Sequence, residues 1–244
     1  MMIKNKRCLL ALGATFVATE AFLAVFLQCT SGASVRISSY LSVVLACLFC
    51  VTFANRTVSY FFTQAALLCT VGADYFLVLI EERQQLPAMI LFLLAQIFYF
   101  LRLYFEDASK GRRCVHLAVR GAAVAAALLL TVVVLGEKAD AVALVSMAYY
   151  ACLILNIVFS FLQNGARSLF SWGLVLFVLC DTVVGLSCIG PYLTIPADSV
   201  IHVLLNPGFN LAWVFYLPSQ VLLAFSLADR KNKENGGESI AVCI

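Results

Sequence analysis

Long apolar stretches alternate with short polar segments along the whole chain. The apolar stretches fall at 8–28, 37–54, 58–80, 86–105, 115–135, 139–161, 169–189 and 209–227. An α-helix needs about 20 largely apolar residues to cross a bilayer. The pattern therefore predicts an all-α, polytopic membrane bundle of eight transmembrane helices. The longest connection, about 190–208, carries three of the five prolines and is expected to form a short lid or a re-entrant segment.

The composition agrees with this organisation. Of the 244 residues, 63% are hydrophobic and only 12% are charged, a balance typical of membrane proteins rather than soluble domains. We expect one transmembrane domain over 1–228 and a polar, disordered tail over 229–244. No soluble catalytic domain remains, so any active site must be built from helix faces and short loops.

The charge distribution predicts the orientation of the bundle. Basic residues gather on one side of the eight spans, at Lys4, Lys6, Arg7, Arg56, Lys110, Arg112, Arg113, Arg167, Arg230, Lys231 and Lys233. The opposite side carries only Arg36, Arg83 and Lys138. By the positive-inside rule both termini are cytoplasmic, which agrees with an even number of spans. We expect a multi-pass protein of the cell membrane, with membrane lipids around it.

Two aspartates, Asp74 and Asp181, lie inside apolar spans. A carboxylate near the bilayer centre costs about 2.5–3.5 kcal/mol on insertion scales. From a rise of about 1.5 Å per residue, Asp181 lies roughly 3 Å and Asp74 roughly 8 Å from the helix midpoints, both toward the outer leaflet. Such costly residues usually face a protein-lined cavity, so these two are the first candidates for catalysis.

Other polar residues inside the spans form a second set of candidates. Glu20, Gln96, Tyr149, Tyr150 and Gln220 lie near mid-depth, and Gln64 and Asn156 lie deeper toward the cytoplasm. If their helix faces converge, they line a polar cavity. Each also has a structural interpretation, because membrane Gln and Asn often bond a neighbouring helix, Tyr packs, and Glu can sit protonated against a carbonyl.

Basic residues near the cytoplasmic helix ends have a plainer expected role. We expect Arg102 and Arg120 to meet lipid phosphates and His116 to face solvent or headgroups. The sequence contains no GxSxG elbow, HExxH pair or Walker loop and no histidine in the middle of a span. The Cys47–Cys50 pair lies in an apolar helix without a second pair. No metal, cofactor or nucleic-acid partner is expected, and carboxylates remain as the chemical groups.

Several segments together resemble a known family. They are AALLCTVGADYFLVL (65–79), LFLLAQIFYFLRL (91–103), LVLFVLCDTVVGL (174–186), FYLPSQVLLAFS (215–226) and the helix of Tyr149 and Tyr150. Their order and spacing resemble the YhhN family, whose animal members are the transmembrane-protein-86 lysoplasmalogenases. The resemblance aligns Asp74, Asp181, Tyr216, Gln220 and Ser226 with family positions. The chain departs from the family pattern at Ala73, at Gln96 in place of a histidine, and at Cys180 in place of a serine.

The resemblance implies hydrolysis of the vinyl-ether bond of a lysoplasmalogen, a lysophospholipid, to a fatty aldehyde and a glycerophospho-headgroup. Asp74 and Asp181 would then be the catalytic pair, one protonated as the acid and the other ionised to activate water. Which of the two is the acid stays open, and the position of Asp181 nearer the bilayer centre slightly favours it for that role. The substrate-binding residues would be Gln96, Tyr149, Tyr150, Tyr216, Gln220 and Glu20. Two alternatives stay open: a proton-coupled transporter of a small molecule or lipid, and a non-catalytic family member.

Overall fold

The computed structural model describes residues 6–52, 57–107, 109–192, 199 and 210–234, the side chains of Lys6, Arg7 and 228–234 excepted. All regular structure in these ranges is helical. The helices are α1 (Lys6–Cys29), α2 (Ala33–Val51), α3 (Val58–Asp74), η1 (Tyr75–Leu79), α4 (Gln85–Glu106), α5 (Lys110–Leu135), η2 (Gly136–Lys138), α6 (Ala141–Asn164), α7 (Leu169–Cys188) and α9 (Leu211–Glu234). Here η1 is a π-helix and η2 a 3₁₀-helix.

The predicted fold class is confirmed. In the described part of the chain, seven helical segments are long and apolar enough to cross a membrane, and α9 adds a shorter apolar stretch over Leu211–Leu227. Each of the eight predicted spans overlaps one of these segments. Helix α9 continues to Glu234, into the predicted tail, and the rest of that tail lies outside the described residues. Most of the predicted outer segment at 190–208 also lies outside them.

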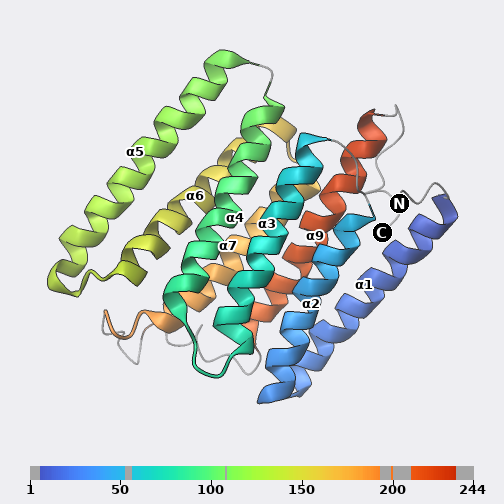
Figure 1. Ribbon diagram of the computed structural model, residues 1–244, viewed down its shortest axis with the longest axis horizontal. Coiled ribbons are helices and arrows are strands. Elements are labelled where there is room, and N and C mark those ends of the chain that lie inside the picture. The colour runs from blue at the N-terminus through green and yellow to red at the C-terminus, as the bar shows by residue number, and fades with distance from the viewer. Residues whose placement is uncertain (1–5, 53–56, 108, 193–198, 200–209, 235–244) are drawn as a thin grey trace.

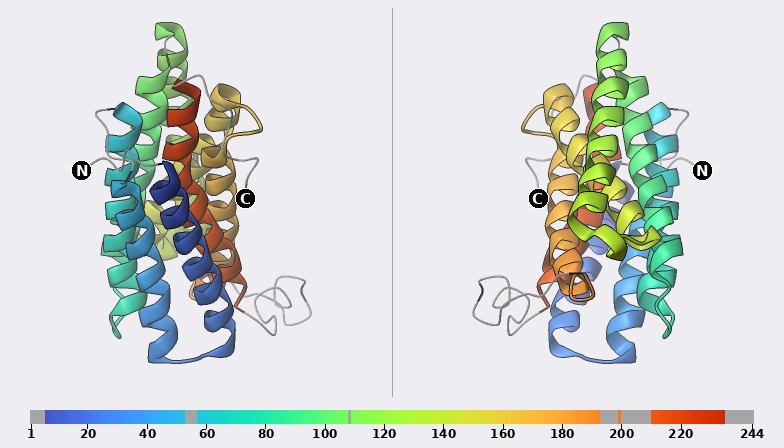
Figure 2. Two further views of the ribbon diagram at one scale, coloured as in Figure 1. Left: turned by 90° about the vertical axis from the view of Figure 1, so that its right-hand side faces the viewer. Right: turned by 90° about the vertical axis from the view of Figure 1, so that its left-hand side faces the viewer.

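The long helices run side by side in alternating directions (Figure 1). Seen from the edge, α2, α3 and α4 lie on one side of the bundle, and α7 and α9 on the other (Figure 2). Helix α5 lies at one edge of the bundle and α1 at the other (Figure 1). We call the two ends of the bundle the basic end and the outer end, following the charge distribution.

Five helices close into a ring. Helix α3 packs against α4, α4 against α6, α6 against α7, α7 against α9, and α9 again against α3. Helices α1 and α2 cover this ring on the side of α9 and α3, and α5 covers α6. We call α3, α4, α6, α7 and α9 the helix ring.

Helices α7 and α9 approach each other closely within the ring. A Cβ atom added to Gly173 would lie 2.9 Å from Cγ of Leu223 and 3.2 Å from its backbone nitrogen. Ser219 of α9 also donates its hydroxyl to the Gly173 carbonyl at 2.9 Å. Small residues allow such close helix packing in membranes. This contact fixes α7, which carries Asp181, against α9, which carries Tyr216.

Contacts at the outer end agree with the charge-based topology. Arg36 forms an exposed ion pair with Glu81 at 3.0 Å, and Lys138 donates to the Tyr192 carbonyl at 3.3 Å. Asp140 caps helix α6 by accepting a hydrogen bond from the backbone N–H of Ala143 at 2.8 Å. That hydrogen bond lowers the pKa of Asp140 below its ordinary value. The connections that carry few basic residues therefore meet at one end of the bundle.

Candidate functional site

Asp74 lies where helix α3 gives way to a π-helix. The π-helical turn Tyr75–Leu79 follows directly, and its wider hydrogen bonding continues to Ile80, whose N–H bonds the Tyr75 carbonyl at 3.2 Å. Short π-helical segments occur often at functional sites. The Asp74 side chain is buried, and it accepts a hydrogen bond from the hydroxyl of Tyr216 on α9.

Asp181 has the same kind of partner. It lies on α7, is half-buried, and accepts a hydrogen bond from the hydroxyl of Tyr149 on α6. In the described part of the chain neither Asp181 nor Asp74 is paired with a basic side chain. Each carboxyl group is thus held by a neutral phenol from another helix of the ring.

Aromatic rings connect the two carboxyl–phenol pairs. The Phe177 ring lies 5.8 Å from the Tyr216 ring and 6.1 Å from the Phe92 ring, measured between centroids. Phe92 lies in turn 5.8 Å from Tyr149. We call Asp74, Tyr216, Asp181 and Tyr149, with these two phenylalanines, the aspartate layer.

Two predicted site residues lie elsewhere. The hydroxyl of Tyr150 pairs with that of Thr182 at 2.7 Å, so it does not reach Asp181 as its neighbour Tyr149 does. Glu20 is buried between α1 and α2, where it accepts a hydrogen bond from the Ser42 hydroxyl. Helices α1 and α2 lie outside the helix ring, so the structure does not bring Glu20 to the two aspartates.

Gln96 and Gln220 are inside the ring and completely buried. Gln96 accepts a hydrogen bond at Oε1 from Asn156 of α6 at 3.0 Å, while its Nε2 has no partner among the described residues. Neither polar side-chain atom of Gln220 has one there either. Gln220 follows Tyr216 by one helical turn, which places its amide on the basic side of the aspartate layer.

Arg120 belongs to the same polar group. It donates to Asn156 Oδ1 at 2.8 Å and to the Cys152 carbonyl at 3.2 Å. Its guanidinium lies 4.3 Å from the centre of the Phe100 ring. The expectation that Arg120 meets lipid phosphates is wrong, because α6 offers its guanidinium acceptors inside the protein.

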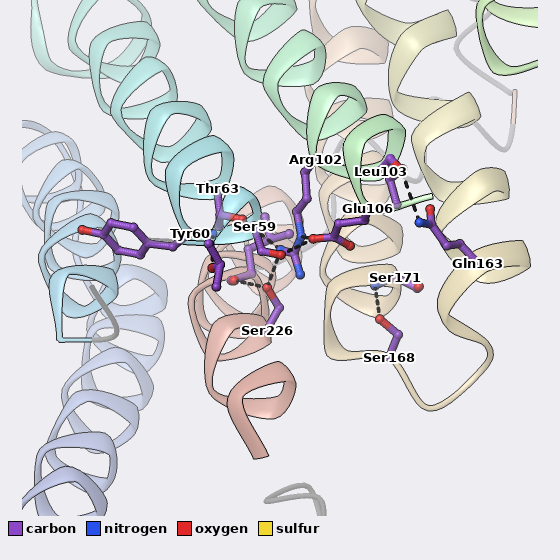
Figure 3. A network of polar contacts seen from close by, with 12 residues as sticks. Ser59, Tyr60, Thr63, Arg102, Leu103, Glu106, Gln163, Ser168, Ser171 and Ser226 are labelled. Atoms are coloured by element: carbon purple, nitrogen blue, oxygen red, sulfur yellow. Dashed lines mark hydrogen bonds and ion pairs between the residues drawn. The ribbon is translucent and has the colours of Figure 1, made fainter. Parts of the chain in front are cut away.

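A second polar network connects α3, α4 and α9 at the basic end (Figure 3). Arg102 pairs with Glu106 at 3.3 Å, donates to Thr63 at 2.9 Å and to Ser226 at 2.8 Å, and lies 4.0 Å from the centre of the Phe170 ring. Glu106 also accepts a hydrogen bond from Ser59 of α3. We call these six residues the basic-end cluster.

Two further expectations about basic residues are wrong. Arg102 does not meet lipid phosphates and His116 does not face solvent or headgroups, because both side chains are buried. His116 packs on the Phe159 ring with 3.8 Å between centroids. A position near a helix end suggests a side chain that reaches the interface, but here the neighbouring helices enclose both side chains.

The geometry of the aspartate layer is suited to proton transfer. Carboxyl groups paired with phenols can hold and release protons, since a phenol donates a hydrogen bond without neutralising a charge as a lysine or arginine would. No three His, Cys, Asp or Glu side chains gather as a metal site in the described part of the chain. The aspartate layer therefore offers acid–base groups inside an enclosed ring.

A comparison with known families identifies the chain. A sequence model of the YhhN family matches residues 34–227, which takes in the helix ring as far as Leu227 of α9 but leaves out α1 and Glu20. The comparisons with curated proteins and with solved structures find no match. The family match covers well over half of the chain. The chain therefore belongs to the YhhN family.

Proposed function

We propose that the protein is an integral-membrane ether hydrolase of the lysoplasmalogenase type. Its substrate would be a lysoplasmalogen with an ethanolamine or choline headgroup. The observation that carries the proposal is the aspartate layer: two buried or half-buried carboxyl groups, each held by a tyrosine, inside the helix ring of a YhhN family member. Family membership alone would not distinguish a catalyst from a binding protein, but this chemistry suits a specific reaction.

The reaction requires an acid and a base. A proton is transferred to the β-carbon of the vinyl ether, which leaves an oxocarbenium ion at the carbon bonded to oxygen. Water adds to that carbon and loses a proton, and the resulting hemiacetal collapses to a fatty aldehyde and the glycerol hydroxyl. One carboxyl group must therefore be protonated and the other ionised, as in an inverting glycosidase with its pair of carboxyl groups.

The two tyrosines have a role in this scheme. Tyr149 and Tyr216 each fix one carboxyl oxygen, which leaves the second oxygen of each aspartate to meet substrate or water. We keep Asp181 as the acid and Asp74 as the water-activating base in this proposal. Apolar faces of the ring helices would hold the alkenyl chain.

The direct test compares two lipids. Purified protein is incubated with a lysoplasmalogen and, separately, with its saturated alkyl-ether analogue, and released aldehyde is measured. We expect aldehyde from the vinyl ether alone, because the alkyl ether cannot form the oxocarbenium ion by protonation at carbon. Release of no aldehyde, or equal cleavage of both lipids, would overturn the proposal.

A proton-coupled transporter is the second candidate. The specific observation in its favour is that buried polar side chains continue from the aspartate layer through Gln96 and Gln220 to Arg102 at the basic end. Membrane carboxylates along such a path are typical of proton-coupled carriers. Lipid uptake into proteoliposomes that depends on a proton gradient, without bond cleavage, would favour this candidate over the hydrolase.

A further inference from the structure

Gln96 and Gln220 lie at similar backbone levels in the helix ring. Gln96 precedes Arg102 on α4 by six residues, and Gln220 precedes Ser226 on α9 by six residues. The side chains of Arg102 and Ser226 meet in a hydrogen bond of 2.8 Å. At a rise of about 1.5 Å per residue, the backbone of each glutamine lies about 9 Å toward the outer end from the residue on its own helix that makes this bond.

Aromatic side chains lie on both sides of the two glutamines, one group toward the outer end and one toward the basic end. On α7, Phe177 packs against Phe92 and Tyr216 on the outer side. Two turns nearer the basic end, Phe170 packs against Tyr99 at 5.5 Å and against the Arg102 guanidinium. We call the level between them the amide layer, with Gln96 on α4, Gln220 on α9 and the fully buried Leu174 on α7.

The orientation of the Gln96 amide is set from outside the ring. Arg120 can only donate hydrogen bonds, so Asn156 must present its oxygen to Arg120 and its NH₂ group to Gln96. Asn156 donates to both the side-chain oxygen and the backbone oxygen of Gln96. The Gln96 Nε2 group is therefore left as a donor, and Arg120 acts as a positioning residue for it.

The amide layer thus presents more polar atoms than the protein satisfies. Gln96 offers a donor, and Gln220 offers a donor and an acceptor, all without a partner among the described residues. Buried polar groups are normally satisfied by protein or by bound water. The groups are neutral amides with both donor and acceptor character, which suits a small neutral molecule that can both give and accept hydrogen bonds.

We propose that Gln96 and Gln220 form a binding site for water inside the membrane-embedded ring. Internal waters typically make about three hydrogen bonds to groups of this kind. As a second step that rests on the proposed function, this site supplies the water that hydrolysis consumes. Tyr216, one turn from Gln220 and bonded to Asp74, connects the amide layer to the aspartate layer.

The first experiment tests water binding without reference to activity. In X-ray radiolytic labelling, hydroxyl radicals formed from bound water oxidise the side chains beside it, even when these are buried. Leu174 in the amide layer is compared with Leu67, which is equally buried in the cluster around α1 and α2. We expect stronger oxidation of Leu174, reduced to the level of Leu67 in a Gln96→Leu/Gln220→Leu variant. Equal and low oxidation of both leucines in the unaltered protein would overturn the water site.

The second experiment tests the supply of water to the reaction. Gln220→Leu should lower kcat and leave KM unchanged, because water is needed after the lipid has bound. A change in KM alone would show that Gln220 contacts the lipid and would overturn the supply step. If Leu174 is oxidised but no aldehyde is released by the unaltered protein, the proposed function fails while the water site stands.

Discussion

The aspartate layer and the basic-end cluster lie at different depths of the same helix ring, and their carboxyl groups have different partners. At the basic end, Glu106 is neutralised by Arg102, and the guanidinium is further held by Thr63 and Ser226. In the aspartate layer, about two to three turns away, Asp74 and Asp181 meet only phenol hydroxyl groups in the described structure. Both regions bury carboxyl groups, but only one of them also buries a cation.

The difference indicates two roles. The basic-end cluster holds helices together, and the aspartate layer is the candidate catalytic site. A buried ion pair whose remaining hydrogen bonds are satisfied holds helices together, and its carboxylate stays charged. A buried carboxyl group that meets only neutral donors is not held in its charged form by a cation. The cluster therefore joins α3, α4 and α9 at the basic end, and under the proposed function the aspartate layer is where protons are exchanged. The two regions should respond differently to substitution.

The largest effect is expected from the aspartates. Asp74→Asn or Asp181→Asn should reduce aldehyde release by about 10²–10⁴-fold, the usual contribution of a general acid or base, while the thermal stability stays close to that of the unaltered protein. The aldehyde assay and thermal unfolding in detergent measure the two quantities. Asp140→Asn is the matched control, since Asp140 caps α6 at the exposed outer end. Full activity in either site variant would remove the carboxylate pair from the mechanism.

The opposite result is expected at the basic end. Arg102→Met leaves Glu106 buried without its cation, which should cost about 3–5 kcal/mol of unfolding free energy. The exposed pair of Arg36 and Glu81 provides the control, because loss of such a surface pair costs about 0–1 kcal/mol. Thermal unfolding of Arg102→Met and Arg36→Met in the same detergent compares them. Equal losses of unfolding free energy in the two variants would contradict the role of the cluster in holding the helices together.

A smaller effect is expected from the phenols. Tyr216→Phe removes a hydrogen bond to Asp74, worth about 1.5–3 kcal/mol when the acceptor is charged, and Tyr149→Phe removes one to Asp181, worth about 0.5–1.5 kcal/mol when the carboxyl group is protonated. We expect kcat to fall about 10- to 100-fold in Tyr216→Phe and about 2- to 10-fold in Tyr149→Phe. Tyr104→Phe, at the basic end of α4, is the matched control. If the two site variants keep the activity of the Tyr104 variant, the phenols do not position the carboxyl groups.

The smallest effect is expected where α7 and α9 meet. Gly173→Ala places a Cβ atom 2.9 Å from Leu223, and such overpacking typically costs about 1–3 kcal/mol. Gly121→Ala on α5 is the control, because nothing lies within 4 Å of its added Cβ atom. Thermal unfolding of the two variants compares the sites. A Gly173 variant as stable as the Gly121 variant would show that the α7–α9 contact adapts freely.

The sequence could predict the helices and the two aspartates because both leave a strong signal. Twenty apolar residues have few alternatives to a membrane span, and a carboxyl group within one is costly enough to stand out. The choice between Tyr149 and Tyr150 was not accessible in the same way. Adjacent residues on a helix point about 100° apart, and only the packing of α6 against α7 decides which hydroxyl reaches Asp181.

The positions of the basic side chains could not be predicted from the sequence in the same way. Arg102, Arg120 and His116 lie near helix ends, and long basic side chains at such positions often reach the interface. The acceptors that hold two of them inside come from other helices: Thr63 and Ser226 for Arg102, and Asn156 for Arg120. Partners as far as 124 residues away in the chain are not visible in local sequence patterns.

The most direct test asks whether a proton that comes from solvent is transferred to the β-carbon of the vinyl ether. Purified protein is incubated with a lysoplasmalogen in heavy water, and the aldehyde is trapped as it forms and analysed by mass spectrometry. We expect one deuterium on the carbon next to the carbonyl group, because a carboxyl group that has exchanged with solvent protonates the β-carbon. Aldehyde released without deuterium at that carbon would contradict acid–base cleavage by the aspartate layer.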